Sequence, residues 1–255
     1  MDRETFRREA ARLGYELGEA EWGALGTLER LLAAGSARAA LTAVHGPQGF
    51  LELHVLDSLG AVLAFDPTSP PPARLVDVGT GAGFPALPLA IALPCHRLYR
   101  GGAAAGSAVA PPQVVALESV RKKAEFVRQA VATLGLDQRV SVLQCRAELA
   151  GRDPALRERF DVALARAVAP LPVLVELALP LVRPGGWLVA LKGPKAPAEC
   201  VAAARAIELL GGGPPELIPV PLGARSPVLV RIGKERPTPS RYPRRPGVPR
   251  KRPLR

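Results

Sequence analysis

The sequence predicts an α/β fold with a mostly parallel sheet that carries helices on both faces, preceded by an N-terminal helical cap. Short apolar runs alternate with helix-like segments from residue 74 to residue 210, and this alternation is typical of a parallel sheet covered on both sides. The first run leads into a glycine-rich turn, DVGTGAG. Two final runs at 216–220 and 227–232 predict an antiparallel edge.

The composition is that of a folded protein. The 255 residues are 48% hydrophobic and 22% charged, which is sufficient for a sizeable core. No apolar stretch reaches the length of a membrane span, and the charged start MDRETFRREAAR does not fit a secretory signal. We therefore expect a cytoplasmic protein without a membrane partner. Cys95, Cys145 and Cys200 lack C-x-x-C spacing, so neither a disulfide framework nor a metal site is expected.

The helical cap is expected over residues 1–65. Apolar residues recur at helical spacing in two early helices and again over 48–65. In the third helix, His54 and Asp57 lie three positions apart. Such a pair can be catalytic, but a helix-surface hydrogen bond fits it equally well. If RNA is the substrate, His54 is a candidate for orienting it without a catalytic role. The proline-rich segment DPTSPPPA follows, and we expect the α/β domain over residues 66–233.

The α/β domain has a predicted order of elements. Strands are expected at 114–118, 140–143, 161–165 and 187–191, and helices at 85–93, 121–134, 153–159, 171–182 and 196–210. A segment rich in Gly, Ala and Pro at about 94–113 is long for a connection in an α/β unit. It is interpreted as a flexible insertion without chemistry.

The glycine turn predicts a nucleotide-like ligand. Gly79, Gly81 and Gly83 lack the side chains that would keep a ligand away from the backbone, and Asp77 closes the strand before them. A dinucleotide site needs a third glycine where Phe84 stands, and no P-loop lysine follows. An acid followed by G-x-G-x-G fits S-adenosylmethionine, which has an amino acid end and a ribose but no phosphate. A purely structural glycine turn is the alternative.

Four strand ends bring charged side chains to one rim of the predicted sheet: Asp77, Glu118, Arg166 and Lys192. Glu118 can accept both hydroxyls of a ribose, unless it is an ordinary acid at a strand end. Arg166 is a candidate for positioning the substrate, because burying an unpaired guanidinium is costly. Lys192 ends the next strand in the same way and is a second candidate. Lys192 is also a candidate for binding RNA.

Two further segments follow the second and third strands. Ala147 and Glu148 come after the third strand, where they can line an adenine edge. Arg121, Lys122 and Lys123 open the helix after the second strand. Because consecutive helical residues point in different directions, we expect at least one of the three to face the cofactor or RNA.

The C-terminal tail, residues 234–255, concentrates positive charge. The chain has a net charge of +11, and its tail has nine Lys and Arg against Glu235 alone, a net charge of +8. Such clustering is typical of proteins that bind phosphate backbones; a solubility tail is the alternative. Six prolines predict an extended chain. Arg244 and Arg245 are the RNA-binding candidates, and deleting 236–255 is expected to weaken RNA binding while leaving cofactor binding intact.

Several motifs occur together in a recognisable order: LTAV, HVLDSL, DVGTGAGFP, ALESVRKKAEF, RAE, ARAVAPLPVLVELALPLVRPGGWLVALKG and YPRRPGVPRKRPL. They resemble the glucose-inhibited division protein B family, the RsmG-type methyltransferases of bacterial small-subunit ribosomal RNA. The resemblance implies a class I (Rossmann-like) methyltransferase fold, S-adenosylmethionine as cofactor and N7 of a guanine in 16S rRNA as acceptor. By the same resemblance, cofactor-contacting positions fall on Gly79, Phe84, Glu118, Ala147, Glu148 and Arg166.

Other functions stay open at this point. A methyltransferase for another RNA, a small molecule or a protein would share the cofactor half but leave the basic tail unexplained. A non-catalytic RNA-binding protein could use the same scaffold, because a fold does not fix function. If guanine N7 is the acceptor, no general base is needed and no residue is certain to be catalytic. The expected partner is small-subunit rRNA or a ribosomal subunit, and nothing in the sequence requires more than a monomer.

Overall fold

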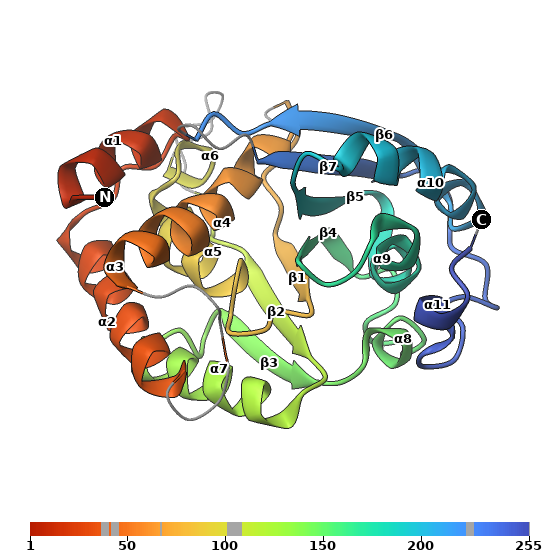
Figure 1. The fold of residues 1–255 in the computed structure, drawn as a ribbon, viewed down its shortest axis with the longest axis horizontal. Helices are drawn as coiled ribbons and strands as arrows, with labels where there is room; N and C mark the ends of the chain where they lie inside the picture. The colour runs from red at the N-terminus through yellow and green to blue at the C-terminus, as the bar shows by residue number, and fades with distance from the viewer. Residues whose placement is uncertain (37–40, 42–45, 67, 101–108, 223–226, 255) are drawn as a thin grey trace.

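A computed structural model describes residues 1–36, 41, 46–66, 68–100, 109–222 and 227–254. These residues form a central sheet between two layers of helices (Figure 1). The strands are β1 (Arg74–Val78), β2 (Gln113–Glu118), β3 (Val140–Gln144), β4 (Phe160–Arg166), β5 (Val182–Lys192), β6 (Gly212–Pro219) and β7 (Val228–Lys234).

The sheet has the order β3-β2-β1-β4-β5-β7-β6. Strands β1 to β5 pair in parallel, and β7 runs antiparallel between β5 and β6. The prediction of a mostly parallel sheet with an antiparallel edge is therefore confirmed. Successive strand residues point to opposite faces; accordingly Leu75 joins one hydrophobic cluster and Val76 the other.

The N-terminal helices cover one face together with helices that follow β1 and β2. They are α1 (Arg3–Arg12), α2 (Glu19–Ser36), α3 (Gly46–Gly49), the π-helical turn η1 (Phe50–Leu56), α4 (Asp57–Gly60), η2 (Ala61–Ala64), α5 (Ala86–Ala92) and α7 (Arg121–Thr133). Phe6, Leu28 and Leu59 from the predicted cap are buried in the same cluster as Leu75 of β1. The N-terminal helices thus share their core with the sheet.

The second face is covered by α8 (Ala147–Ala150), α9 (Leu171–Ala178) and α10 (Ala196–Leu209), with the short α11 (Val248–Lys251) packed beside α9. Leu174 and Ala203 from these helices are buried with Val76 and Ile232 of the sheet. The apolar residues of α9 and α10 thus form the second core.

Two predicted helices differ from the structure. The helix expected at 153–159 is absent, and this segment forms turns. Glu158 has a φ of 53°, a left-handed conformation that no α-helix contains. The helix expected at 171–182 ends at Ala178 and continues as the 3-10 turn η4 (Leu179–Leu181), because Pro180 has no N–H for an α-helical hydrogen bond.

The first described part of the predicted insertion, residues 94–100, packs against the N-terminal region. Its elements are η3 (Leu93–Cys95) and α6 (Arg97–Arg100). His96 is buried, and its Nε2 lies 2.9 Å from the carbonyl oxygen of Leu13. Tyr99 is also buried and donates a 2.8 Å hydrogen bond to the carbonyl of Pro72. Residues 101–108 of the predicted insertion lie outside the described residues.

Candidate functional site

The glycine turn leaves β1 at a topological switch point, because β2 and β4 flank β1 on opposite sides. Open α/β sheets bind ligands at such points. Gly79, Gly81 and Gly83 have φ values of +72°, +61° and +93°, a region that favours glycine. A Cβ on Gly79 would lie 3.0 Å from Val168 Cγ2, and one on Gly83 would lie 2.4 Å from Leu87 Cδ1. Gly79 therefore permits Val168 to pack against the turn, whereas Gly83 permits Leu87 of α5 to do so.

Glu118 lies over this turn. Its side chain is buried, Oε2 accepts a 2.9 Å hydrogen bond from the N–H of Gly81, and Oε1 accepts one of 2.7 Å from Val120. Each carboxylate oxygen has two lone pairs. The carboxylate is thus held in place by the backbone and can accept further donors, such as the two hydroxyls of a ribose.

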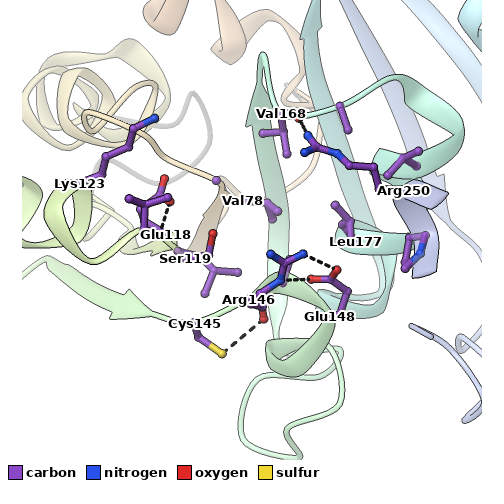
Figure 2. Close-up of a pocket in the computed structure, with 17 residues that line it drawn as sticks. Val78, Glu118, Ser119, Lys123, Cys145, Arg146, Glu148, Val168, Leu177 and Arg250 are labelled. Carbon is purple, nitrogen blue, oxygen red and sulfur yellow. Dashed lines mark hydrogen bonds and ion pairs between the residues drawn. The ribbon is translucent and has the colours of Figure 1, made fainter. Parts of the chain in front are cut away.

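A cavity of ≈ 390 Å³ opens beside Glu118 (Figure 2). Its wall comes from the ends of β1 and β2, the segments after β3 and β4, helix α9, and the C-terminal residues Pro249 and Arg250. Among the predicted site residues it is lined by Gly79, Glu118, Lys123, Ala147 and Glu148. The cavity has both apolar walls and carboxylates, which suits a nucleoside.

Glu148 is held at the far end of this cavity. The side chain is buried, and its Oε1 accepts hydrogen bonds from Arg146 at 3.0 Å and from the N–H of Gly247 at 2.8 Å. Burial by itself raises the pKa of Glu148, but these hydrogen bonds outweigh it and the net shift is downward. Glu148 is therefore an ionised acceptor at neutral pH.

A second cavity of ≈ 260 Å³ shares Gly79, Glu118 and Lys123 with the first. His54, Phe84 and Arg166 line it. Its walls are thus formed by residues from the N-terminal helices, the glycine turn and β4.

His54, Phe84 and Arg166 form one cluster. Arg166 donates a 2.7 Å hydrogen bond to the carbonyl of Leu53, and its Nη2 lies 2.8 Å from His54 Nδ1. The guanidinium lies 5.3 Å from the centre of the Phe84 ring, and the His54 ring stacks on Phe84 at 4.5 Å. Burial, and then the charge of Arg166, lower the pKa of His54 to about 4. His54 is neutral at pH 7, so Nδ1 can accept the hydrogen bond.

Arg166 also reaches a third cavity, of ≈ 330 Å³, which is lined by Asp57, Ala167 and Lys192. Lys192 donates 2.8 Å hydrogen bonds to the carbonyl of Ala169 and to Glu199. Ala167 has a φ of 55° and lines both the second and the third cavity. A left-handed non-glycine residue is uncommon and is concentrated at functional sites.

Asp77, which was predicted to contact the cofactor, lines none of these three cavities. Its carboxylate is fully buried, and Oδ2 accepts a 3.1 Å hydrogen bond from the N–H of Ala86 at the start of α5. Burial raises the pKa of Asp77 to about 6. The position of Asp77 is that of a support beneath the turn.

Replacing Asp77 with asparagine is expected to stabilise the protein at pH 7 by about 1–2 kcal/mol, because the uncharged amide keeps an acceptor for Ala86 without the cost of burying a charge. Because the folded-state pKa is raised, the protonated carboxyl group of Asp77 contributes its full stability below pH 3.8. This contribution is lost as pH rises through about 6 and the group ionises. The advantage of the variant should therefore vanish near pH 4. Urea unfolding at both pH values measures it, and an advantage that persisted at pH 4 would contradict this explanation.

The predicted RNA-binding cations occupy different environments. Lys123 lines the first two cavities, Arg121 lies 3.5 Å from Glu125, and Lys122 is exposed. In the tail Arg245 is exposed, whereas the guanidinium of Arg244 holds the carboxylate of Glu176, which is 0% exposed. The structure therefore does not support an RNA contact for Arg244, because a partner within the protein occupies it.

For several residues that line these cavities, no motif in the sequence indicates a role in the site. Val168 and Ala169 follow β4 and line the first cavity; parallel order alone could have placed this segment beside β1. Pro249 and Arg250 were missed because a basic, proline-rich run has the same composition whether it is solvated or packed.

Among the described residues no cluster of His, Cys, Asp and Glu could hold a metal ion. The described ranges also include no helix long and apolar enough to cross a membrane.

Comparisons with known proteins agree with this architecture. An O-methyltransferase from Bacillus cereus, solved in complex with SAH, superposes with a TM-score of 0.54 at 18% identity, covering 82% of this chain and 91% of that one. TomG, an O-methyltransferase from Streptomyces achromogenes solved in complex with SAM, gives a TM-score of 0.52 at 19% identity over 92% of this chain and 100% of that one. At these identities the likeness shows the fold alone, and it confirms the Rossmann-like methyltransferase fold.

Sequence comparisons go further. The family model described as rRNA small subunit methyltransferase G matches residues 24–218. Two proteins called ribosomal RNA small subunit methyltransferase G are similar to this chain. That of Moorella thermoacetica is 44% identical over 85% of this chain and 83% of the relative, and that of Deinococcus radiodurans is 41% identical over 99% and 92%. The predicted resemblance is confirmed: the chain belongs to the rRNA small subunit methyltransferase G family.

Proposed function

We propose that this protein transfers a methyl group from S-adenosylmethionine to N7 of a specific guanine in bacterial small-subunit (16S) ribosomal RNA. Family membership supports the reaction and the class of substrate. The observation that carries the proposal is the pair of adjoining cavities at the switch point of the sheet, which share Gly79, Glu118 and Lys123. One cavity suits a nucleoside, and the other lies beside Arg166.

The residues present fit this cofactor, which supplies a methyl group on a positively charged sulfur. Gly79 lines both cavities, and its lack of a side chain leaves room for Val168 to pack against the turn. In the proposal, Glu118 accepts the ribose hydroxyls and the segment Ala147–Glu148 lines the adenine. Arg166, at the second cavity, binds the carboxylate of the methionine end, a pairing in which charge-assisted hydrogen bonds are strong.

The proposed chemistry needs alignment rather than proton transfer. Guanine N7 carries a lone pair and no proton, so no base has to remove a hydrogen. No proton transfer is required of His54, which is neutral and whose Nδ1 lies within hydrogen-bond distance of Arg166. Positioning of two reactants can supply roughly 7–11 kcal/mol of a barrier. We place the entering guanine at the third cavity, which adjoins the second through Arg166 and Ala167.

Exposed cations of the tail are proposed to bind RNA phosphates. Arg245, Lys251 and Arg252 are exposed. Replacing all three with glutamine is expected to weaken RNA binding and to reduce the slope of log affinity against log salt by up to about 2–3, because a protein releases about one counterion for each phosphate that it neutralises. A filter-binding titration at several salt concentrations measures this slope. An unchanged slope would place the RNA-binding surface elsewhere.

Methyl transfer from labelled S-adenosylmethionine to small-subunit RNA lacking its own modification tests the proposed function. Label on N7 of a single guanine is the expected result. Unlabelled RNA despite measurable cofactor binding would contradict the acceptor, and a protein that bound no S-adenosylmethionine would contradict the assignment of the cavity.

A further inference from the structure

The C-terminal residues 234–254, here called the strap, pack against the face of the sheet that α9 and α10 cover. Lys234 is 1% exposed, donates to the carbonyl of Leu179 at 2.8 Å and to Thr238, and lies 3.4 Å from Glu158. Burial lowers the pKa of Lys234 to about 8. The first residues of the strap are therefore fixed inside the protein.

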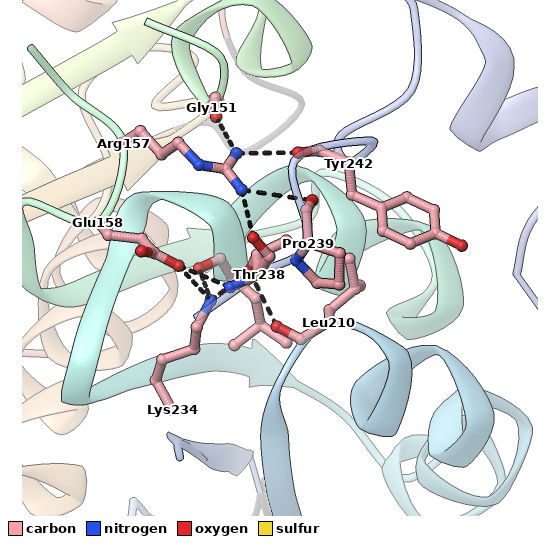
Figure 3. Close-up of polar contacts among 9 residues, drawn as sticks. Gly151, Arg157, Glu158, Leu210, Lys234, Thr238, Pro239 and Tyr242 are labelled. Atoms are coloured by element: carbon pink, nitrogen blue, oxygen red, sulfur yellow. Dashed lines mark hydrogen bonds and ion pairs between the residues drawn. The ribbon is translucent and has the colours of Figure 1, made fainter. Parts of the chain in front are cut away.

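Arg157 holds the middle of the strap (Figure 3). Its Nη1 donates 2.8 Å hydrogen bonds to the carbonyls of Gly151 and Tyr242, and its Nη2 donates one of 2.5 Å to Thr238. Nη2 also lies 3.4 Å from the carbonyl of Pro239, so four backbone carbonyls, three of them from the strap, converge on one guanidinium. The turns at residues 153–159 thus present Arg157 to the strap.

A second anchor lies closer to the cavity. Arg244 donates to both carboxylate oxygens of Glu176 with its side chain, and its backbone N–H adds a further bond of 2.8 Å. Glu176 belongs to α9, whose neighbouring residue Leu177 lines the first cavity. The anchor therefore places the following strap residues at the edge of that cavity.

The end of the strap forms part of the cavity wall. Gly247, with a φ of +82°, donates its N–H to Glu148, 99 residues away in sequence. Pro249 is buried and lines the cavity. Arg250 lines it too, and its guanidinium lies 3.5 Å from the carbonyl of Val168 (Figure 2). Glu148 and Val168 belong to the segments after β3 and β4, so the strap joins two walls of the cavity.

We infer that residues 247–250 of the strap are part of the cofactor-binding site, where Pro249 supplies an apolar contact to the nucleoside and Gly247 fixes the carboxylate of Glu148. This inference rests on the proposed function, since it takes the first cavity as the site of S-adenosylmethionine. It reverses the expectation from the sequence that the tail is a separate RNA-binding arm. Cofactor affinity then depends on the tail even when no RNA is present.

Two variants test this inference by calorimetric titration with S-adenosylmethionine in the absence of RNA. Deleting residues 246–255 removes the wall but keeps the Arg157 and Arg244 anchors, and should weaken cofactor binding by about tenfold or more, the effect expected from removing one hydrogen bond and one apolar contact. Pro249→Ala in the full chain should weaken it by about threefold. Thermal unfolding checks that both variants are folded.

The matched control is the variant with Arg245, Lys251 and Arg252 replaced by glutamine, which removes charge but leaves the wall intact. It should bind S-adenosylmethionine as the parent does. If the parent binds the cofactor and both the deletion and Pro249→Ala bind it equally well, the inference is overturned while the proposed function stands. A parent that bound no cofactor would instead overturn the assignment of the cavity itself.

Discussion

Replacing Arg244 with methionine is expected to lower the free energy of unfolding by about 3–5 kcal/mol. The substitution removes the guanidinium that holds both oxygens of Glu176, and Glu176 is 0% exposed. The backbone N–H of residue 244 would remain as a partner, but the negative charge would lose its counterion in a site that water does not reach. Urea unfolding at pH 7 measures the change.

Two controls separate the buried pair from a general effect of charge. The double variant Glu176→Met and Arg244→Met replaces both partners with apolar side chains of similar length, and should recover most of the stability, because a buried ion pair often contributes little beyond its apolar replacement. Arg245→Met alters the adjacent but exposed arginine and should change stability by less than about 0.5 kcal/mol. If Arg244→Met behaved like Arg245→Met, the ion pair would not be what holds the strap.

The fold class and the glycine turn were predictable because both depend on local pattern. The run before Gly79 is apolar and β-branched and forms β1, and the turn needs glycine at three left-handed positions. The strand ends that carry Glu118, Arg166 and Lys192 do meet at one edge of the sheet, as parallel pairing requires. The strand, the turn and the charged strand ends are each indicated by residues close to them in the sequence.

The remaining features depend on partners that are distant in sequence. Arg157 bonds to carbonyls 81 and 85 residues away, so its partners in the strap cannot be read from the residues near it in sequence. The charge of the tail likewise does not distinguish Arg244, which is paired inside the protein, from Arg245, which is exposed. Direct contact between the cofactor and Asp77 was an expectation from its strand-end position, yet its side chain lies beneath the turn.

The cluster of His54, Phe84 and Arg166 shows what topology adds to pattern. From sequence, His54 is a candidate for binding RNA and the other two are candidates for binding the cofactor, in three separate segments. The structure brings them into contact: Arg166 bonds to η1 through Leu53 and His54 and lies over Phe84. One side chain thus connects the N-terminal helices, the glycine turn and β4 at the point where we place the methionine end of the cofactor.

Arg166→Ala is accordingly expected to lower kcat/KM for methyl transfer to small-subunit RNA by about a hundredfold or more, the effect of misplacing a reactant by roughly 1 Å. Arg183→Ala is the matched control. Arg183 lies in β5 and pairs with Asp161 at 2.6 Å, and it lines none of the three cavities around the glycine turn. Its replacement should leave transfer unchanged.

Cofactor affinity measured without RNA then distinguishes two ways in which Arg166 can act. If its guanidinium binds the methionine carboxylate, Arg166→Ala weakens S-adenosylmethionine binding, and Arg166→Lys restores part of it because the charge returns without the planar fork. If Arg166 acts only by holding η1 against Phe84, cofactor binding stays near the parent value while transfer falls, and His54→Ala reproduces the decrease. Transfer at the parent rate by Arg166→Ala would remove Arg166 from both roles, and the proposed assignment of the second cavity would fail with it.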